Sequence, residues 1–211
     1  MGLSETLFAR WYPVVVGWSE NAGQRQTRAE LIARARGRTL EIGAGNGYNL
    51  PHYTGDVTEL VVSEPSRHML KHLRARIASE PPPVGAVTLV RAGAELLPFE
   101  DHTFDTVTAV FVHCTIPDPS AALREIARVL KPGGQYVFME HVRAPDNALL
   151  ARFQDLVEVP HTWVAAGCHP NRRMADLLAQ SPLTIEELIP GRMPRSSPTV
   201  RPTIRGVAIA G

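Results

Sequence analysis

Three glycines alternate with other residues directly after a short apolar segment. Gly43, Gly45 and Gly47 lie in the stretch LEIGAGNGYN at residues 40–49, with Glu41 just ahead of them. Glycine accepts a positive φ and lets a ligand approach the backbone closely, so three of them after a strand indicate a tight turn around a bound molecule. An ordinary strand-to-helix loop is the alternative reading of the glycines alone.

A second acidic residue favours the ligand. Glu64 ends the next apolar segment, TELVVSE, and follows Glu41 by about 20 residues, the spacing at which a carboxylate reaches the ribose hydroxyls of a nucleoside. The G-x-G-x-G spacing differs from the G-x-G-x-x-G of dinucleotide enzymes, and Asn49-Leu50-Pro51 supplies no basic residue for a phosphate. The sequence therefore predicts a nucleoside ligand held without a phosphate cradle.

Histidines at strand ends and in the C-terminal third are the candidate general bases. A histidine near neutral pH can take a proton from an acceptor, or it can be a hydrogen-bonded structural residue. We take three as catalytic candidates and a fourth as a candidate lining residue: His113, His141, His161 and, fourth, His169. Cys114 and Cys168 belong to no paired motif such as C-x-x-C, so we expect no metal site and buried, inert thiols.

Composition limits the class of protein. The chain has 211 residues, of which 44% are hydrophobic, and this fits a single domain over residues 1–211. With 22 basic and 21 acidic residues, its net charge of +1 gives no reason to expect a nucleic-acid partner. No signal-peptide pattern is present, and apolar runs are shorter than the ~20 residues of a membrane span, so we expect a cytoplasmic protein with no integral membrane segment.

Strand and helix patterns alternate along the chain. The predicted strands lie at 38–42, 58–65, 87–99 with an exit loop, 104–115, 134–142, 183–190 and 203–211, the last two as antiparallel partners. The predicted helices lie at 27–37 with Thr27 as N-cap, 66–79, 118–134 with a proline–glycine stop, and within 146–180 with a break at 167–170. This alternation predicts a three-layer α/β domain that binds ligands at the carboxyl ends of its strands.

Four segments, taken in order, resemble the landmarks of class I S-adenosylmethionine-dependent methyltransferases. They are LEIGAGNGYN, VVSEPS, AGAELLPFEDHTFDTV and REIARVLKPGG, and they cover roughly residues 38–142. The resemblance implies a Rossmann-like fold with a seven-stranded, mostly parallel sheet of order 3-2-1-4-5-7-6. It also implies a methyltransferase that uses S-adenosyl-L-methionine.

The resemblance further implies the residues that contact the cofactor. The methionine and ribose part would meet the glycine turn and the end of the fourth strand: Glu41, Gly43, Ala44, Gly45, Asn46, Gly47, Val112, His113 and Cys114. The ribose hydroxyls and the adenine would meet Glu64, Pro65, Ser66, Ala94 and Glu95. Gly93 stands where many relatives carry an acidic residue, so adenine recognition would depend on backbone groups.

The C-terminal third resembles a narrower group. FMEHV followed by FQDLVEVPHTWVAAGCHPNRR is similar to the methyltransferase-like proteins that include the small-thiol S-methyltransferases of animals, whose N-terminal membrane anchor is not recognisable here. This resemblance implies a small, fairly apolar acceptor, with a thiol or sulfide first. A phenolic or quinone-like O- or C-acceptor and a catalytically silent cofactor-binding interaction module remain as alternatives. We expect Trp163 to cap an apolar acceptor pocket.

These expectations divide the chain into four parts. Residues 1–36 form N-terminal helices and, through Trp11, Tyr12 and Trp18, either a lid or a packing helix; 37–142 form the cofactor-binding core. Residues 143–181 form acceptor-side helices, and 182–211 form the strand pair. The arginine-rich stretch PGRMPRSSPTVRP is expected to be a solvated loop, with a peripheral membrane contact as the alternative.

Overall fold

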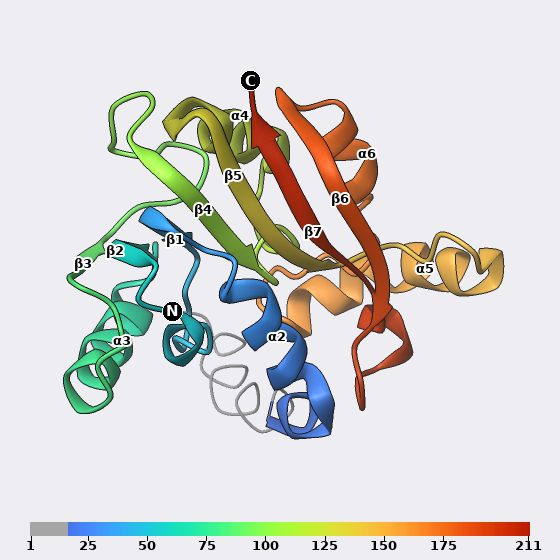
Figure 1. The fold of residues 1–211 in the computed structure, drawn as a ribbon. Helices are drawn as coiled ribbons and strands as arrows, with labels where there is room; N and C mark the ends of the chain where they lie inside the picture. The colour runs from blue at the N-terminus through green and yellow to red at the C-terminus, as the bar shows by residue number, and fades with distance from the viewer. Residues whose placement is uncertain (1–16) are drawn as a thin grey trace.

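The computed structural model describes residues 17–211, which alternate between strands and helices as predicted (Figure 1). The strands are β1 (Gly37–Ile42), β2 (Val57–Ser63), β3 (Val87–Val90), β4 (Phe104–Val110), β5 (Leu130–His141), β6 (Leu183–Arg192) and β7 (Pro202–Ala210). The helices are α2 (Arg25–Ile32), α3 (Arg67–Ser79), α4 (Pro119–Val129), α5 (Ala148–Val164) and α6 (Met174–Ala179). Shorter helical turns are η1 (Glu20–Gln24), η2 (Leu50–His52) and η3 (Pro198–Val200).

The strands form a 7-stranded sheet of order β3-β2-β1-β4-β5-β7-β6, which confirms the predicted order. The pairs from β3 to β5 are parallel, and β7 runs antiparallel to both β5 and β6. Strand β1 lies between β2 and β4, where the strand order reverses. Since such a switch point opens a crevice outside the carboxyl ends of the strands, the turn after β1 is placed where this fold class binds ligands.

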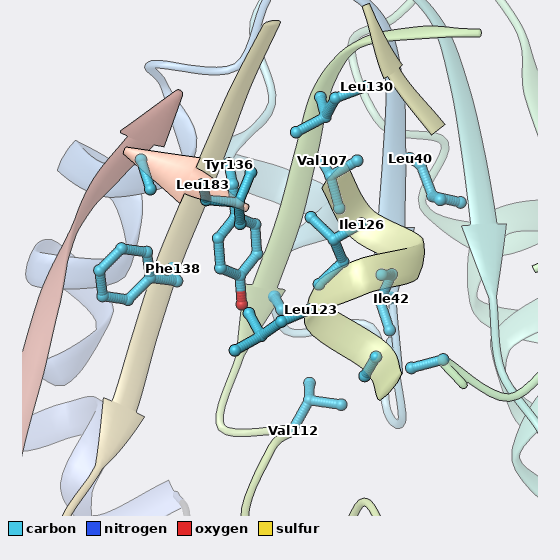
Figure 2. Packing of buried hydrophobic residues seen from close by; sticks show 14 of the residues in the cluster. Leu40, Ile42, Val107, Val112, Leu123, Ile126, Leu130, Tyr136, Phe138 and Leu183 are labelled. Carbon is cyan, nitrogen blue, oxygen red and sulfur yellow. The ribbon is translucent and has the colours of Figure 1, made fainter. Parts of the chain in front are cut away.

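Alternating residues of the sheet build a core on each face. On one face, Tyr136 and Phe138 of β5 belong to a cluster with Leu123 and Ile126 of α4 (Figure 2). On the other face, Val137 of the same strand joins a cluster with residues of α2 and α3. A fully buried side chain of this kind contributes about 1.5–3 kcal/mol, so the two layers of helices hold the sheet rigid beneath the turns at its edge.

Three predicted ends of helices were wrong. The helix predicted to reach Gly37 ends at Ile32, and Gly37 already begins β1. Thr27 is not an N-cap, because the helical turns of η1 run directly into α2 and the Thr27 hydroxyl donates to the carbonyl of Gly23 at 3.5 Å. The helix predicted to reach residue 134 ends at Val129, and the sequence LKPGG already belongs to β5. There the ladder with β4 is irregular, since Leu130 pairs with Phe104 but the next pair is Thr106 with Gln135.

The strand predicted over 104–115 was also too long, because β4 ends at Val110. Phe111 adopts a positive φ of 58°, and the chain leaves the sheet. The next two backbone N–H groups, of Val112 and His113, donate to the Glu140 carboxylate at 3.0 and 3.1 Å instead of to a neighbouring strand. A side chain of β5 thus replaces the ladder at this point and turns the chain across the edge of the sheet.

The C-terminal third follows the prediction in outline. Helices α5 and α6 are separated by a turn that contains the predicted break, and β6 and β7 form the predicted antiparallel pair. None of the helices in the described part of the chain has the length and apolar composition to cross a membrane. The predicted lid residues Trp11 and Tyr12 lie outside the described residues, whereas Trp18 is exposed.

Candidate active site

The glycine turn after β1 uses positive φ at each of its three glycines, with 62° at Gly43, 53° at Gly45 and 71° at Gly47. A Cβ at Gly43 would meet Val112 Cγ1 at 2.5 Å, and one at Gly47 would meet Leu50 Cδ1 at 2.8 Å. A Cβ at Gly45 would have no neighbour nearer than 3.9 Å. Two glycines therefore permit close packing, while a Cβ at Gly45 would make only ordinary contacts, which leaves room for a ligand to approach the backbone there.

Glu64 lies directly beside this turn. Its side chain is buried, its Oε2 accepts the backbone N–H of Gly45 at 3.0 Å, and its Oε1 accepts that of Ser66 at 2.9 Å. A carboxylate has about four acceptor positions, so these two bonds leave lone pairs for hydroxyl donors. The structure thus places Glu64 directly beside the glycine turn, although the two are distant in the sequence.

A cavity of about 50 Å³ opens beside the turn. Besides the glycine turn, it is lined by Arg28, Tyr48, Asn49, Val110 and Phe111. The guanidinium of Arg28 lies 5.8 Å from the ring centroids of both Tyr48 and Phe111. Sequence reasoning missed Arg28, since an arginine in an amphipathic helix gives no sign that it will be buried in a site.

Glu41 lies behind this cavity and is fully buried. Its carboxylate accepts from Asn49 Nδ2 and from the Tyr53 hydroxyl, each at 2.9 Å. Asn49 in turn accepts from Arg28, which is paired with Glu20 at 2.7 Å. Burial raises the pKa of Glu41 from 4.5 to about 7, against the lowering effect of these hydrogen bonds. Glu41 is therefore linked to the cavity through Asn49 instead of lining it.

His113 lies inside the protein. Its side chain is 1% exposed, and its Nδ1 lies 3.1 Å from Glu140 Oε1 and 3.4 Å from the Tyr136 hydroxyl. Its Nε2 is buried and has no hydrogen-bond partner among the described residues. These contacts of His113 hold the turn after β4, and a role of this side chain toward an acceptor stays a prediction.

The other histidine candidates lie around the ends of β5 and α5. His141 is buried, with Nε2 at 3.1 Å from Cys168 Sγ. His161 on α5 is partly exposed, and burial, followed by the charge of His141, lowers its pKa. His169 pairs with Glu158 at 2.7 Å. Trp163 is 75% exposed and does not line the cavity beside the glycines, and its place over an acceptor pocket stays a prediction.

The remaining predicted cofactor residues are spread along the loops next to the turn. Ser66 is the N-cap of α3, where its Oγ accepts from the backbone N–H of Met69 at 3.4 Å, and Pro65 is exposed. Ala94 is buried in the cluster that also contains Val112, whereas Glu95 is partly exposed. Cys114 is buried beyond Val112 and His113.

The switch-point glycine turn, the acidic residue at the end of β2 and the sheet order define a class I S-adenosylmethionine-dependent methyltransferase. Residues 40–138 match the family model of the methyltransferase domain. The chain is also 31% identical over 188 residues to the phosphatidylethanolamine N-methyltransferase of Cereibacter sphaeroides, which covers 87% of this chain and 88% of that protein. The chain belongs to this methyltransferase family, and its cofactor is S-adenosylmethionine.

Other relatives differ in length and are named for other methyl-transfer reactions. The ubiquinone/menaquinone biosynthesis C-methyltransferase UbiE of Shewanella sp. (strain ANA-3) is 35% identical over 127 residues, which cover 59% of this chain and half, 50%, of that protein. A solved S-adenosylmethionine-dependent methyltransferase of Thermotoga maritima superposes with a TM-score of 0.67 at 20% identity, covering 98% of this chain and 99% of that one. The last similarity shows the fold alone.

Proposed function

We propose that this methyltransferase transfers the methyl group to a thiol or sulfide of a small, fairly apolar molecule. The observation that carries the proposal is the burial of His113 and His141, each of which has one ring nitrogen at a protein atom: His113 Nδ1 lies 3.1 Å from Glu140 Oε1, and His141 Nε2 lies 3.1 Å from Cys168 Sγ. A phenol or an activated carbon needs a base that reaches the acceptor. A thiol with a pKa of about 8.5 is partly ionised at neutral pH and provides its own nucleophile.

The reaction requires positioning more than proton transfer. The thiolate attacks the cofactor's methyl carbon in line, forming the new S–CH₃ bond as the bond from that carbon to the sulfonium sulfur breaks. The thiol proton goes to solvent, and the cofactor leaves as the neutral thioether. Holding the two reactants in line supplies most of the acceleration in such a step, up to about 7–11 kcal/mol, which fits a site built on the rigid edge of a sheet.

We assign the cofactor contacts from the geometry of the turn. Glu64 accepts from the ribose hydroxyls with its remaining lone pairs, and the backbone at Gly45 lies along the ribose and methionine part. The guanidinium of Arg28, which lines the cavity, pairs with the methionine carboxylate. A cofactor analogue that lacks this carboxylate should bind the wild-type protein about 10–100-fold more weakly, since a charge-assisted bond contributes roughly 1.5–3 kcal/mol. Equal affinities in calorimetry would exclude this role of Arg28.

A second candidate acceptor is the amine of a phosphatidylethanolamine. It is favoured by the name of the relative that matches most of this chain and by an apolar stripe on α5, where Leu149, Leu156 and Trp163 are all exposed. Such a stripe fits a lipid surface better than it fits water. The quinone-like acceptor of the shorter-matching UbiE relatives is the third possibility.

One experiment separates these acceptors. The purified protein is incubated with cofactor carrying a labelled methyl group and, separately, with an alkyl thiol, an aryl thiol, a quinol, a phenol or phosphatidylethanolamine vesicles. Labelled thioether as the main product supports the proposal, whereas labelled lipid or quinol as the main product refutes it. Glu64→Ala is the matched control, because product formation by this variant should fall in proportion to cofactor occupancy for every acceptor.

A further inference from the structure

A cluster of three metal-ligating side chains lies at the carboxyl edge of the sheet, close to the cofactor turn in the fold. Cys114 follows β4, His141 is the last residue of β5, and Cys168 follows α5. The two sulfur atoms and a ring nitrogen all lie within 4.8 Å of one another, and Cys168 Sγ is 3.1 Å from His141 Nε2. Phe111, three positions before Cys114, lines the cavity beside the glycines.

These distances fit a tetrahedral ion. Zinc binds thiolates at about 2.3 Å and imidazole nitrogen at about 2.0–2.1 Å, which places ligand atoms of one tetrahedron roughly 3.5–4 Å apart. The ligand atoms, all within 4.8 Å of one another, therefore need shifts of at most about an ångström to surround a central ion. Both cysteines are free thiols, and among residues 17–211 the Cys114 sulfur has one further hydrogen-bond partner, the Phe111 carbonyl at 3.8 Å.

No local pattern indicates this site, because the three ligands come from separate elements: Cys114 and Cys168 each lie 27 residues from His141 in the sequence. The expectation of no metal depended on the lack of a paired motif such as C-x-x-C. Parallel strands bring residues that are distant in the sequence to one edge, so a site can form without such a motif.

We propose that Cys114, His141 and Cys168 bind a Zn²⁺ ion and leave its fourth position open for the thiolate of the acceptor. Three protein ligands and one open position are the arrangement of catalytic zinc sites, and two cysteines with one histidine is a known set for them. Cys114 and His141 are buried, but Cys168 is partly exposed, so a small thiol can reach the ion from that side. The assignment of the fourth position depends on the thiol function proposed above, whereas the assignment of the three protein ligands does not.

The ion would prepare the nucleophile. A thiol that binds Zn²⁺ loses its proton to solvent and stays on the metal as a thiolate at neutral pH. The sulfur then attacks the methyl carbon, the sulfonium C–S bond breaks, and the neutral thioether, a weaker ligand, leaves the ion. No oxidant or reductant is needed, and the metal returns to its starting state.

One feature of the cluster sets its expected affinity. When Nε2 of His141 binds the ion, Nδ1 carries the ring proton, and this nitrogen is buried with no hydrogen-bond partner among the described residues. The outer hydrogen bond that usually supports a zinc-bound histidine contributes about 10–100-fold in affinity. We therefore expect an ion that a strong chelator removes without unfolding the protein.

The first test is metal content. The full chain is purified with reductant, supplemented with Zn²⁺ and desalted, and its metal content is measured by elemental mass spectrometry. A parallel sample loaded with Co²⁺ is measured by absorption spectroscopy. Wild type should hold close to one ion per chain and show thiolate-to-cobalt charge-transfer bands. Cys114→Ser and Cys168→Ser should each lose most of the metal and reduce those bands. His169→Gln is the matched control, because this side chain pairs with Glu158 and lies outside the cluster.

Circular dichroism and cofactor binding show whether each variant is folded. The proposal is refuted if wild type takes up no metal under reducing conditions, or if both folded serine variants keep as much as wild type. Metal-free protein whose mass falls by two hydrogens in air, with no uptake after reduction, would also refute it by showing a disulfide between the two cysteines.

The second test addresses the open position without turnover. Adding an alkyl thiol to the Co²⁺ protein should shift the visible bands and add charge-transfer intensity, whereas the corresponding alcohol should not. Unchanged bands exclude the fourth position as the acceptor site. Thiol methylation should then fall at least tenfold after chelation and return with Zn²⁺. If cobalt spectra respond to the thiol but no thiol is methylated, the proposed function fails while the metal site remains.

Discussion

The carboxylate of Glu64 holds the backbone of Gly45: Oε2 accepts its N–H at 3.0 Å. The other oxygen accepts the N–H of Ser66 at 2.9 Å, at the start of α3. One side chain at the end of β2 therefore fastens both the glycine turn and the first turn of the next helix. Because Gly45 lines the cavity beside the turn, this bond orients the backbone that a ligand would contact.

Replacing Glu64 should weaken cofactor binding and leave the fold intact. Glu64→Ala removes a charged acceptor for the ribose hydroxyls, and hydrogen bonds to a charged group contribute roughly 1.5–3 kcal/mol, so the dissociation constant should rise about 10–100-fold. Calorimetry with the demethylated cofactor measures the change. Glu59→Ala, on the same strand and paired at the surface with Arg38, is the control and should bind as wild type does. An unchanged constant in Glu64→Ala would place the ribose elsewhere.

Alanine at two glycines of the turn should give opposite results. Gly43→Ala places a Cβ 2.5 Å from Val112, so it adds overpacking of about 1–3 kcal/mol to the cost of a positive φ and lowers the melting temperature. The Cβ of Gly45→Ala meets no atom nearer than 3.9 Å, so its stability loss should stay near the cost of the φ alone, about 1 kcal/mol.

The binding results separate the two roles. Gly45→Ala should lose cofactor affinity beyond its small effect on stability, because the methyl group stands where the ligand approaches. Thermal unfolding without ligand and calorimetry with ligand give the two numbers. A Gly45→Ala protein with wild-type affinity would show that the cofactor does not pass this position.

Cofactor affinity should fall as the pH falls below about 7. Burial raises the pKa of Glu41 from 4.5 to about 7, so in the ligand-free protein this carboxyl is ionised only above that pH. The cofactor carries an ammonium and a sulfonium, and a cation nearby favours the ionised form. Binding below pH 7 must therefore release a proton, and affinity should fall by up to about tenfold per pH unit. Titrations between pH 5 and 8 in buffers of different ionisation enthalpy measure both effects.

The same group has the opposite effect on the ligand-free fold. Since the pKa of Glu41 is raised in the folded protein, the unfolded chain loses the carboxyl proton first as the pH rises above 4.5. The free energy of unfolding therefore falls between pH 4.5 and about pH 7, where the folded protein loses the same proton. Denaturant unfolding of the ligand-free protein should show this decline. Glu41→Gln should remove the slope in both experiments; a slope that persists would assign it to another group.

Local sequence signals predicted the parts of the site that one segment builds. The glycine turn and Glu64 each depend on a single strand end, and the strand order followed from their resemblance to known landmarks. Arg28, Asn49 and the Cys114–His141–Cys168 cluster could not be predicted in this way. Their roles arise only when α2, β4, β5 and the end of α5 come together at one edge of the sheet. The sequence of any one of these elements does not predict its contacts with the others.

The boundaries that were wrong have the same cause. The sequence FVHCT continues an apolar, β-branched run, which predicts a strand, but Glu140 from β5 accepts the N–H groups of Val112 and His113 and ends β4 early. Most buried backbone donors are paired, and here the partner is a side chain distant in the sequence.

The last prediction concerns His161, the partly exposed candidate base on α5. If the acceptor is a thiol, His161→Gln should lower kcat/KM less than about tenfold, because the substrate ionises without help and only positioning is lost. If the acceptor is a phenol or an activated carbon, loss of a general base should cost about 10²–10⁴-fold and flatten the acidic limb of the pH–rate profile. Thr162→Ala, one position along the same helix, is the control for local packing. Steady-state rates across pH 6–9 with saturating cofactor measure the difference. A folded His161→Gln protein that binds the cofactor but has lost turnover with every thiol would contradict the thiol assignment.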